Sequence, residues 1–487
     1  MKLKTLVIGS GPSAWAVLNS ISNLEDVHLI DGGSSVRVDS AKITKHLGLK
    51  DKFGSIHAVA SADDFGIVDE SEDALPASLS RGGLSEIWGN GFTPYQFSQI
   101  DNSGIISDKV LTKTMAETLE LIPHSNLNLN SNFISRFNLV ELISEGNLEE
   151  NLPIHPVFDK ILSKTKTSNS PSNILIDRPF FLLNSESCTR CGLCLTGCPY
   201  GSLFDSGESI NRMVLQKKLP RKNIYSGIVT RIIPSNDFVK VLFTSDANET
   251  QELIFDRIII SAGTLATAIL LMKSDLIPNQ LKIPDCQVFY FGLISRKRIT
   301  RRENLPDLAQ LVILPGDTSK GDFQISLYKP SETSRKRISF SIFSDFSKFF
   351  KIPRLLSDFI VPAIGFLPQE KSGFLVLEKI NGTIVLRRVP NPESVREINS
   401  ILRQIQPLTK KMAFFLSRYT VKIPDPGSGF HLGASLPLGG DVIDLQGRLR
   451  SEPKISIMDP SILPSLPAGA HTFVSMSLIR HIMKSRP

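Results

Sequence analysis

Four of the chain's five cysteines lie in one short run. The run reads Cys188-Thr-Arg-Cys191-Gly-Leu-Cys194-Leu-Thr-Gly-Cys198-Pro199, which is the C-x2-C-x2-C-x3-C-P spacing of bacterial ferredoxins. Thiolates at this spacing can converge on one iron–sulfur cluster, and the proline discourages a helix from running back through the site. Since such clusters mostly transfer single electrons, the run predicts a second redox group elsewhere in the chain.

The cysteine run could also form a zinc site, a disulfide pair, or a loop without any ligand. A zinc site normally pairs two separated C-x2-C knuckles, and a disulfide needs an oxidising compartment. The fourth ligand is open too, because in two-cluster ferredoxins the cysteine before proline binds the other cluster. We predict a [4Fe–4S] cluster on these four cysteines, or a [3Fe–4S] cluster if Cys198 does not reach. The fifth thiol, Cys286, is expected to be a buried core residue.

The second redox group is predicted at the start of the chain. An apolar strand at 5–8 leads into a Gly-rich turn, a helix from Trp15 to about Ile21, and a second strand at 27–30. Gly9 permits the tight turn, Gly11 lets the backbone approach a pyrophosphate, and small residues follow. This pattern is typical of FAD or NAD binding, and a βαβ unit without a ligand is the alternative. The residues predicted to bind the dinucleotide here are Gly9, Gly11, Ser13, Ala14 and Asp31, the last at a ribose hydroxyl.

Composition narrows the function classes. The formal net charge is +7 over 487 residues, and no Lys/Arg stripe carries interleaved aromatics, so we expect no nucleic-acid partner. No apolar run is long enough to span a bilayer. The N-terminus imitates an export signal, but its apolar part is short and cleavage would destroy the dinucleotide turn. We therefore expect a cytoplasmic protein, with peripheral contact to the inner membrane surface as a further hypothesis.

Three segments, taken in order, resemble the glucose–methanol–choline (GMC) oxidoreductase family. The first is Arg81-Gly-Gly-Leu-Ser-Glu-Ile-Trp88-Gly-Asn-Gly91, and the second is the strand, Gly turn and helix of 256–272. The third runs from Phe430-His431-Leu-Gly433-Ala-Ser through Met458-Asp459-Pro-Ser-Ile-Leu-Pro464 to Ala470-His471-Thr-Phe-Val-Ser-Met476. The similarity covers both ends and the middle of the chain and is weak from about 280 to 425.

The resemblance implies an FAD cofactor and a hydride-transfer reaction. Members of this family oxidise an alcohol to a carbonyl by hydride transfer to the flavin, and some carry a similar cysteine-rich stretch. The cofactor-binding positions that the resemblance implies in this chain are Gly82, Gly83, Ser85, Trp88, Gly89, Asn90, Val229, Ala262, Gly263, Asp459 and Thr472. The family's two catalytic positions fall on His431 and His471. At the first, Ala434 and Ser435 replace the Gly and Thr of the family's H-x-x-G-T motif.

Two histidines also suit this chemistry on physical grounds. Hydride removal from a carbinol carbon requires that the hydroxyl proton be taken at about the same time, and a neutral imidazole is a natural base near pH 7. A second imidazole can hold the substrate oxygen and stabilise developing negative charge. We expect His431 to be the base and His471 to be the oxygen ligand.

The predicted fold is α/β: a discontinuous Rossmann-like FAD-binding domain plus an α+β substrate domain with a mostly antiparallel sheet. The FAD-binding domain comprises 1–105, 206–278 and 425–487; a connecting segment with the cysteine motif comprises 106–205, and a substrate or cap domain comprises 279–424. Strands are expected at about 286–295, 309–314, 322–328 and 373–389, and a helix over 395–417 that Pro407 interrupts. The segment 343–366 is apolar with interspersed Lys and Arg, which predicts a cap helix or an interfacial membrane helix.

These patterns predict an FAD-dependent dehydrogenase acting on a sugar or polyol-like alcohol. Electrons would leave through the iron–sulfur cluster to an external acceptor, such as a quinone, a cytochrome or a ferredoxin-like protein. Two alternatives stay open. One is an alcohol oxidase that uses oxygen and has no functional cluster. The other is a flavin/iron–sulfur reductase or electron-transfer subunit, in which neither histidine serves turnover.

Overall fold

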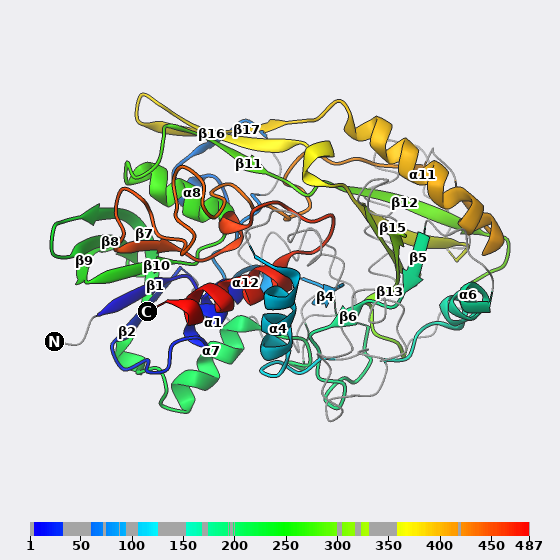
Figure 1. Ribbon diagram of the computed structural model, residues 1–487, viewed down its shortest axis with the longest axis horizontal. Helices are drawn as coiled ribbons and strands as arrows, with labels where there is room; N and C mark the ends of the chain where they lie inside the picture. Colours follow the sequence, from blue (N-terminus) through cyan, green and yellow to red (C-terminus); the bar gives the residue numbers. More distant parts are fainter. Residues whose placement is uncertain are drawn as a thin grey trace.

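The computed structural model describes most of the chain, in two structurally distinct parts. The described residues are 4–32, 60–71, 75–86, 88–93, 106–124, 152–167, 174–192, 194, 198, 200–299, 304–316, 323–330, 358–416 and 420–486. One part is built around a mostly parallel sheet and the other around antiparallel sheets (Figure 1). The predicted α/β class, with a discontinuous Rossmann-like domain and a mostly antiparallel second domain, is confirmed.

The first part contains a seven-stranded sheet in the order β19-β10-β1-β2-β7-β8-β9. Its strands are β1 (Thr5–Ile8), β2 (Val27–Asp31), β7 (Ile224–Pro234), β8 (Val239–Ser245), β9 (Thr250–Phe255), β10 (Arg257–Ile260) and β19 (Ile455–Ile457). The pairs from β19 to β7 are parallel, and β8 and β9 extend the sheet as an antiparallel hairpin. Both faces of the parallel strands are covered by helices, so the strands are continuous apolar runs such as Leu6-Val7-Ile8.

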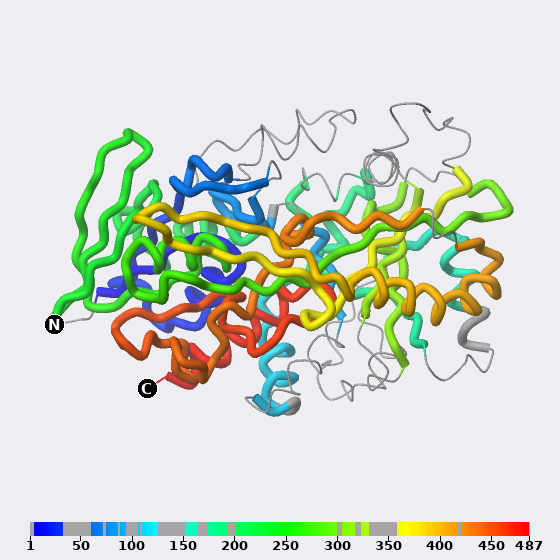
Figure 2. The backbone as a smooth tube through the Cα atoms, turned by 90° about the horizontal axis from the view of Figure 1, so that it is seen from above, coloured from blue at the N-terminus to red at the C-terminus, as the bar shows by residue number. Residues whose placement is uncertain are grey.

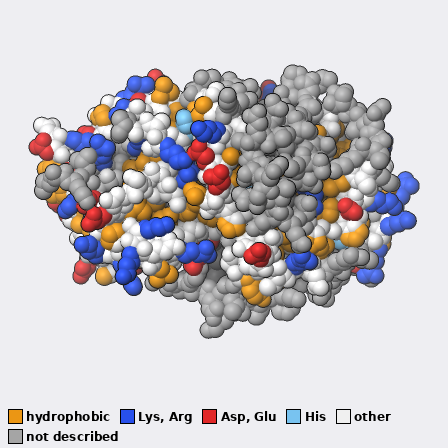
Figure 3. All heavy atoms as spheres, turned by 60° about the horizontal axis from the view of Figure 1, so that its bottom comes forward, with side chains coloured by type: hydrophobic (Ala, Val, Ile, Leu, Met, Phe, Trp, Pro, Cys, Tyr) orange, Lys and Arg blue, Asp and Glu red, His pale blue; other side chains and the backbone are white. Residues whose placement is uncertain are grey.

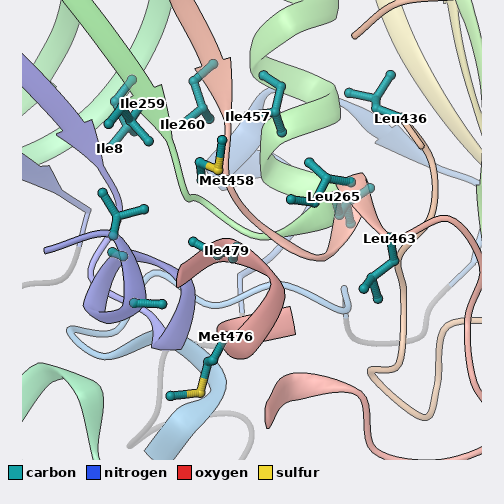
Figure 4. Close-up of a cluster of buried hydrophobic side chains, with 14 of the residues drawn as sticks. Ile8, Ile259, Ile260, Leu265, Leu436, Ile457, Met458, Leu463, Met476 and Ile479 are labelled. Carbon is teal, nitrogen blue, oxygen red and sulfur yellow. The ribbon is translucent and has the colours of Figure 1, made fainter. Parts of the chain in front are cut away.

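Helices from distant parts of the sequence cover this sheet (Figure 1). They are α1 (Pro12–Leu18), α4 (Asp108–Leu119), α7 (Ser206–Leu215) and α12 (Thr472–Ser485) on one side and α8 (Thr264–Lys273) on the other. Figure 4 shows residues of β1, β10, β19, α8 and α12 gathered in one buried cluster, among them Ile8, Ile260, Leu265, Ile457 and Ile479. The helix that the sequence predicted from Trp15 to about Ile21 is α1, which starts earlier, at Pro12, and ends at Leu18.

The second part is a six-stranded sheet, β18-β12-β15-β14-β13-β5, in which all neighbouring strands are antiparallel. Its strands are β5 (Ile174–Asp177), β12 (Val288–Ser295), β13 (Ala309–Pro315), β14 (Gln324–Tyr328), β15 (Ile360–Phe366) and β18 (Phe414–Leu416). Phe289 lies opposite Gly365, and a Cβ atom on Gly365 would lie 2.1 Å from the Phe289 ring. The aromatic ring thus fills the space that the glycine leaves, which fixes the register of this pair.

A four-stranded sheet, β11-β16-β17-β3, joins the two parts. Its strands are β11 (Gln280–Pro284), β16 (Phe374–Ile380), β17 (Thr383–Val389) and β3 (Val68–Asp69), and α8 packs against β11 and β16. A two-stranded ladder of β4 (Gly91–Phe92) and β6 (Phe180–Phe181) lies near the junction. The predicted strand region 373–389 is therefore a hairpin of β16 and β17, with its turn at Asn381 and Gly382.

Two helices accompany the antiparallel sheet: α6 (Pro156–Thr167) and α11 (Ser394–Lys411). The prediction that Pro407 interrupts the second helix is wrong, because α11 continues through it. Pro407 is exposed, so the Arg403 carbonyl that loses its helical hydrogen bond can bond to water instead. The apolar side of α11 packs into the sheet through Ile398, Ile401, Leu402, Ile405 and Leu408.

The predicted helix over 343–366 is contradicted at its C-terminal end, because Ile360–Phe366 is strand β15 in the middle of the antiparallel sheet. The rest of that segment, up to residue 357, lies outside the described residues. In the described part of the chain, every helix is too short or too polar to cross a lipid bilayer.

Both ends of the chain lie beside the seven-stranded sheet, at the opposite end of the molecule from α11 (Figure 2). On the face in Figure 3, Lys and Arg side chains are spread among acidic and apolar ones. The net charge of +7 is thus not gathered into one basic stripe on this face.

Candidate functional site

The Gly-rich turn after β1 has the geometry that its sequence predicts. Gly9 adopts φ +102°, and a Cβ atom there would lie 2.5 Å from the Ser261 carbonyl oxygen. Only glycine therefore fits between β1 and the loop after β10. Gly11 is the N-cap residue of α1, with a proline at the first helical position. Ser13 and Ala14 are both buried, and Ala14 lets the helix pack closely on the sheet.

A second glycine turn lies directly against the first. Gly82 and Gly83 have φ values of +90° and +58°, and a Cβ atom on Gly83 would lie 3.5 Å from Gly11 Cα. The Gly82 N–H donates to Ser10 Oγ at 2.8 Å, and the Ser85 hydroxyl donates to the Gly82 carbonyl at 2.6 Å. Two of the predicted cofactor-binding segments, far apart in sequence, are therefore adjacent in space.

Ser206 also belongs to this junction, although the sequence patterns did not single it out. Its hydroxyl lies 3.0 Å from the Ser10 carbonyl oxygen and 3.0 Å from Ser85 Oγ. Ser206 opens α7, whose N-cap Asp205 accepts the Glu208 N–H at 3.0 Å. An Asp three residues before a Glu is a recognisable helix-start signal, so the Asp205–Glu208 spacing could have located this helix.

Asp31 and Val229 lie at the same edge of the sheet. Asp31 ends β2, is 8% exposed, and pairs with Ser226 of β7. The next residue, Gly32, is so close to β7 that a Cβ atom there would lie 3.4 Å from the Ile228 side chain. This edge contains the carboxyl ends of β1 and β2, where doubly wound sheets bind their ligands.

Trp88, Gly89 and Asn90 follow the second glycine turn along the chain. Asn90 is 1% exposed and has φ +52°, and its Nδ2 donates to the Phe204 carbonyl at 3.3 Å. Within the described residues, the buried Trp88 Nε1 and Asn90 Oδ1 have no hydrogen-bond partner. Because buried polar atoms are normally satisfied, these two atoms are available to a ligand.

Asp459 acts within the protein at the N-terminus of α8. Its carboxylate accepts the Ser461 N–H at 2.9 Å, the Thr267 hydroxyl and the Gly263 N–H. Burial raises the pKa of Asp459, and these donors oppose that rise. The arrangement fixes the turn of Ala262 and Gly263, where φ is +85° and a Cβ atom would meet open space.

The two predicted histidines lie together. The ring centroids of His431 and His471 are 5.8 Å apart, with an angle of 70° between the ring planes. His431 follows the loop after residue 420 and contacts the Phe366 ring at 5.2 Å, and His471 is the N-cap residue of α12, followed by Thr472. The two rings are thus brought together from segments separated by the strand β19 and its flanking loops.

Burial makes both imidazoles weak bases. It lowers the pKa of His431 to about 3, helped by the nearby His471, and lowers the pKa of His471 to about 4. Both rings are therefore neutral near pH 7. Solvent does not protonate them at that pH, but a reacting hydroxyl group can transfer its proton to them. A positive charge on one ring disfavours a positive charge on the other, so protonation of one histidine would lower the pKa of its neighbour further.

A hydrogen bond sets the tautomer of His471. Its Nε2 lies 3.1 Å from the Leu432 carbonyl oxygen, which can only accept, so Nε2 carries the hydrogen. Nδ1 is then a lone-pair acceptor, and it is buried without a partner among the described residues. The Leu432 carbonyl also accepts the Thr264 hydroxyl at 3.0 Å, so α8 helps to hold this histidine.

The cysteine run forms the end of a hairpin. An antiparallel bridge joins Leu183 to Leu203, and the Asn184 N–H donates to the Ser202 carbonyl at 2.8 Å. Buried side chains under the loop form a small core of their own: Leu152, Phe181, Leu183, Cys194, Leu203 and Leu308. The descending arm of the hairpin leads straight to Asp205 and Ser206, so the cysteine loop is anchored at the glycine junction.

Three of the four thiols accept backbone N–H groups. The donors are Arg190 to Cys188, Asp307 to Cys194, and Ser202 to Cys198 at 3.3 Å. Buried Lys329 lies against the same loop, because a Cβ atom on Gly192 would be 4.0 Å from its Nζ. Such donors and a cation stabilise thiolates, whereas burial raises the pKa of the Cys188 and Cys194 thiols.

The described cysteines are not closed around a metal position. Among the residues that the structure describes, no three His, Cys, Asp or Glu side chains form a group that could hold a metal ion. The loop thus supplies ligands of the right type, with suitable N–H donors, but not the gathered arrangement of a bound cluster. The iron–sulfur prediction therefore still rests on the sequence spacing, and the geometry of the described cysteines does not support it.

No protein-family model matches the chain, and no curated protein matches its sequence. Among the solved structures that share its fold is pyridoxine 4-oxidase from Mesorbium loti. The TM-score is 0.61 with 12% sequence identity, over 99% of this chain and 99% of that chain. The chain therefore shares the two-domain fold of that oxidase. At this identity the likeness shows the fold and leaves the reaction to be argued from the site.

Proposed function

We propose that the protein is an FAD-dependent oxidoreductase that oxidises a hydroxyl group to a carbonyl. The observation that carries this proposal is the pair of neutral imidazoles, that of His471 buried and that of His431 half-buried, with ring centroids 5.8 Å apart. The GMC-type fold and the resemblance of the three sequence segments favour the same reaction class. The likeness to an enzyme named for oxidising pyridoxine adds support of the same kind.

The residues of the site fit an FAD molecule. The glycine turns at 9–11 and 82–83 would leave room for its pyrophosphate, and Asp31 would bind a ribose hydroxyl. The buried Trp88 Nε1 and Asn90 Oδ1 would face the flavin and gain partners there. When bound, FAD supplies the hydride acceptor.

His431 is proposed as the base that takes the hydroxyl proton. Its ring keeps partial exposure, and no hydrogen bond occupies its nitrogens among the described residues. Its low pKa keeps it neutral, so it has a lone pair ready at any pH at which the protein is used. A hydrophobic neighbour, Phe366, excludes water from one side of the ring.

His471 is proposed as the second, positioning imidazole of the pair. The Leu432 carbonyl fixes its ring, and Nδ1 is the only nitrogen left for the substrate hydroxyl. Acting as an acceptor, Nδ1 would share the hydroxyl hydrogen with His431 and so orient it before transfer to His431. In this tautomer Nδ1 carries no hydrogen, so it could donate to the substrate oxygen only after a proton had reached it.

An iron–sulfur cluster on Cys188, Cys191, Cys194 and Cys198 is the second part of the proposal. The spacing, the three N–H donors and buried Lys329 support it. The covalent path from Ser202, which bonds to Cys198, down to Ser206 limits the distance from the Cys198 thiol to the glycine junction to about 18 Å. When bound, the cluster would supply single-electron transfer to an external acceptor.

The substrate, the acceptor and the location are proposals that rest on sequence resemblance alone. A sugar or polyol-like alcohol is proposed as substrate, because the Gly82-Gly83-Leu-Ser form resembles family members associated with sugar metabolism. A quinone, a cytochrome or a ferredoxin-like protein is proposed as acceptor. A cytoplasmic location with peripheral membrane contact would suit a quinone.

Two measurements on anaerobically purified protein test the proposal. The first is the content of flavin, iron and sulfide, for which one FAD and about four irons are expected. The second is bleaching of the oxidised flavin by a panel of sugars, polyols and ring alcohols, with the double variant H431A/H471A as control. Protein without flavin, or flavin that no alcohol in the panel reduces, would overturn the dehydrogenase assignment.

A second candidate is an oxidase that passes electrons from flavin directly to oxygen. The name of the structural neighbour favours it. Stopped-flow reoxidation separates the two: an oxidase returns to oxidised flavin rapidly in air, whereas a cluster-dependent dehydrogenase needs a one-electron acceptor. Flavin without iron after reconstitution would also favour the oxidase.

A further inference from the structure

The short link between β11 and β12 contains two fully buried polar residues that the proposed reaction does not use. Asp285 is 1% exposed and Cys286 is 0% exposed. The link crosses from the four-stranded sheet to the six-stranded sheet, so it is fixed at both ends by strands. Its backbone runs alongside the segment of His431, with an antiparallel bridge between Asp285 and Leu432.

Cys286 contacts the segments of both histidines. Its backbone N–H donates to the His431 carbonyl at 3.1 Å. Its sulfur accepts the N–H of Gly469, two residues before His471, at 3.3 Å. The thiol hydrogen is directed to the Leu367 carbonyl at 3.4 Å, and burial keeps the thiol protonated by raising its pKa. Cys286 thus joins the two histidine segments, the first through its backbone N–H and the second through its sulfur, and its thiol also bonds to the residue that follows β15.

Asp285 holds the same loop from the other side. Its Oδ2 accepts the Gly427 N–H at 2.8 Å, and the Gly433 N–H donates to the Pro284 carbonyl at 3.3 Å. The loop between these contacts includes Phe430, which has φ +61°. A bulky residue in that conformation is strained, so the loop needs external contacts to hold its shape.

We infer that Asp285 and Cys286 are positioning residues that fix the separation and orientation of His431 and His471. The inference rests on the proposed function for its catalytic consequence. The hydrogen bonds themselves are independent of that function. Each histidine segment is bonded to the same rigid link, so loosening the link would move one ring relative to the other.

Single variants test the inference through their kinetics. C286A removes both sulfur contacts, and we expect kcat to fall about 10- to 100-fold with KM changed much less, as for a misplaced catalytic group. C286S keeps a donor and an acceptor and should recover most of the loss. D285A should lower kcat in the same way, whereas D285N keeps an oxygen for the Gly427 N–H and should recover it.

A matched control separates positioning from general destabilisation. Val241 in β8 is also 0% exposed, and β8 belongs to the hairpin that extends the seven-stranded sheet at the end opposite β19. V241A should lower the melting temperature about as much as C286A does and leave kcat unchanged. Equal losses of kcat in V241A and C286A, or no rescue by serine, would overturn the inference.

Hydrogen-exchange mass spectrometry tests the contact between Cys286 and Gly469 without any substrate. In C286A, the peptide that contains Gly469 should exchange faster, because its N–H has lost the sulfur acceptor, while peptides of β8 and β9 stay unchanged. Unchanged exchange at Gly469 would overturn the inference. If exchange rises as expected but no alcohol reduces the wild-type flavin, the proposed function is wrong, whereas the structural role of Asp285 and Cys286 in holding the two histidine segments is retained.

Discussion

The histidine pair and the cysteine loop are built in opposite ways. The cysteines are neighbours in sequence, and one hairpin with its small core presents all four. The histidines are brought together by contacts from Thr264, Cys286 and Leu432, which lie far apart along the chain. The spacing of the four thiols can therefore be recognised from the sequence, whereas the contact between the two histidines depends on how separate segments pack.

This difference predicts that each site can be removed without the other. C191S should abolish iron binding and the reduction of one-electron acceptors, while the reduction of flavin by alcohol persists. Iron content and anaerobic flavin bleaching measure the two effects. T189A changes an exposed residue of the same loop and should keep its iron. If C191S retained full iron, the cysteine run would not be the cluster site.

Replacing His431 should have the converse effect, which is to slow flavin reduction and leave iron binding intact. H431A should slow flavin reduction about 10²- to 10⁴-fold, the range for loss of a general base, and leave flavin and iron content unchanged. Rapid-mixing absorbance of the flavin gives the rate. H124A removes another buried histidine, whose Nδ1 bonds to the Ile122 carbonyl, and this variant should be reduced at the wild-type rate. Near-normal reduction by H431A would exclude it as the base.

His471 should matter less, because its proposed role is to orient the hydroxyl. H471N keeps a polar side chain at the start of α12, and we expect flavin reduction to slow about 10- to 100-fold. H471A should slow it further. A loss in H471N as large as that in H431A would assign the base to His471 instead, and rapid mixing with the same alcohol would reveal it.

The smallest expected effect is on pH dependence. Both histidine pKa values are lowered by folding, so the unfolded state binds more protons below pH 6.5 and stability falls as pH falls towards 4 and 3. Each ring should contribute a loss on the order of 2 kcal/mol between pH 6.5 and pH 5. Denaturant unfolding of wild type and H431A/H471A measures this difference. An acid limb of activity near pH 6.5 would contradict buried neutral rings.

Local patterns in the sequence predicted the parts that local forces determine. The turn at Gly9 and Gly11 and the strand β12 follow from glycine conformation and from an apolar run. The placement of both histidines also followed, but only through the family resemblance. No periodicity brings His431 to His471, because that contact depends on how separate segments pack.

Several features depend on the assembled fold. Ser206 completes the glycine junction only because α7 starts there, and Cys286 acts on both histidine segments only because the link crosses between two sheets. Pro407 stays within α11 because it faces solvent, which the sequence alone does not specify. β5 pairs with β13 across a long stretch of chain, so its place in the antiparallel sheet was not predictable from its own residues.

Helix α12, near the C-terminal end of the described residues, packs against α1, near the N-terminal end. Arg480 in α12 donates to the Asn19 carbonyl at the end of α1, and β19 completes the sheet beside β10. During synthesis on the ribosome, the first βαβ unit therefore emerges long before its covering helix exists. Until α12 and β19 have been synthesised, the apolar side chains of β1 and α1 that they cover stay exposed. We therefore expect chaperones to bind the nascent N-terminal half. A ribosome that stalls late would release a product that proteases should remove rather than a partly active enzyme.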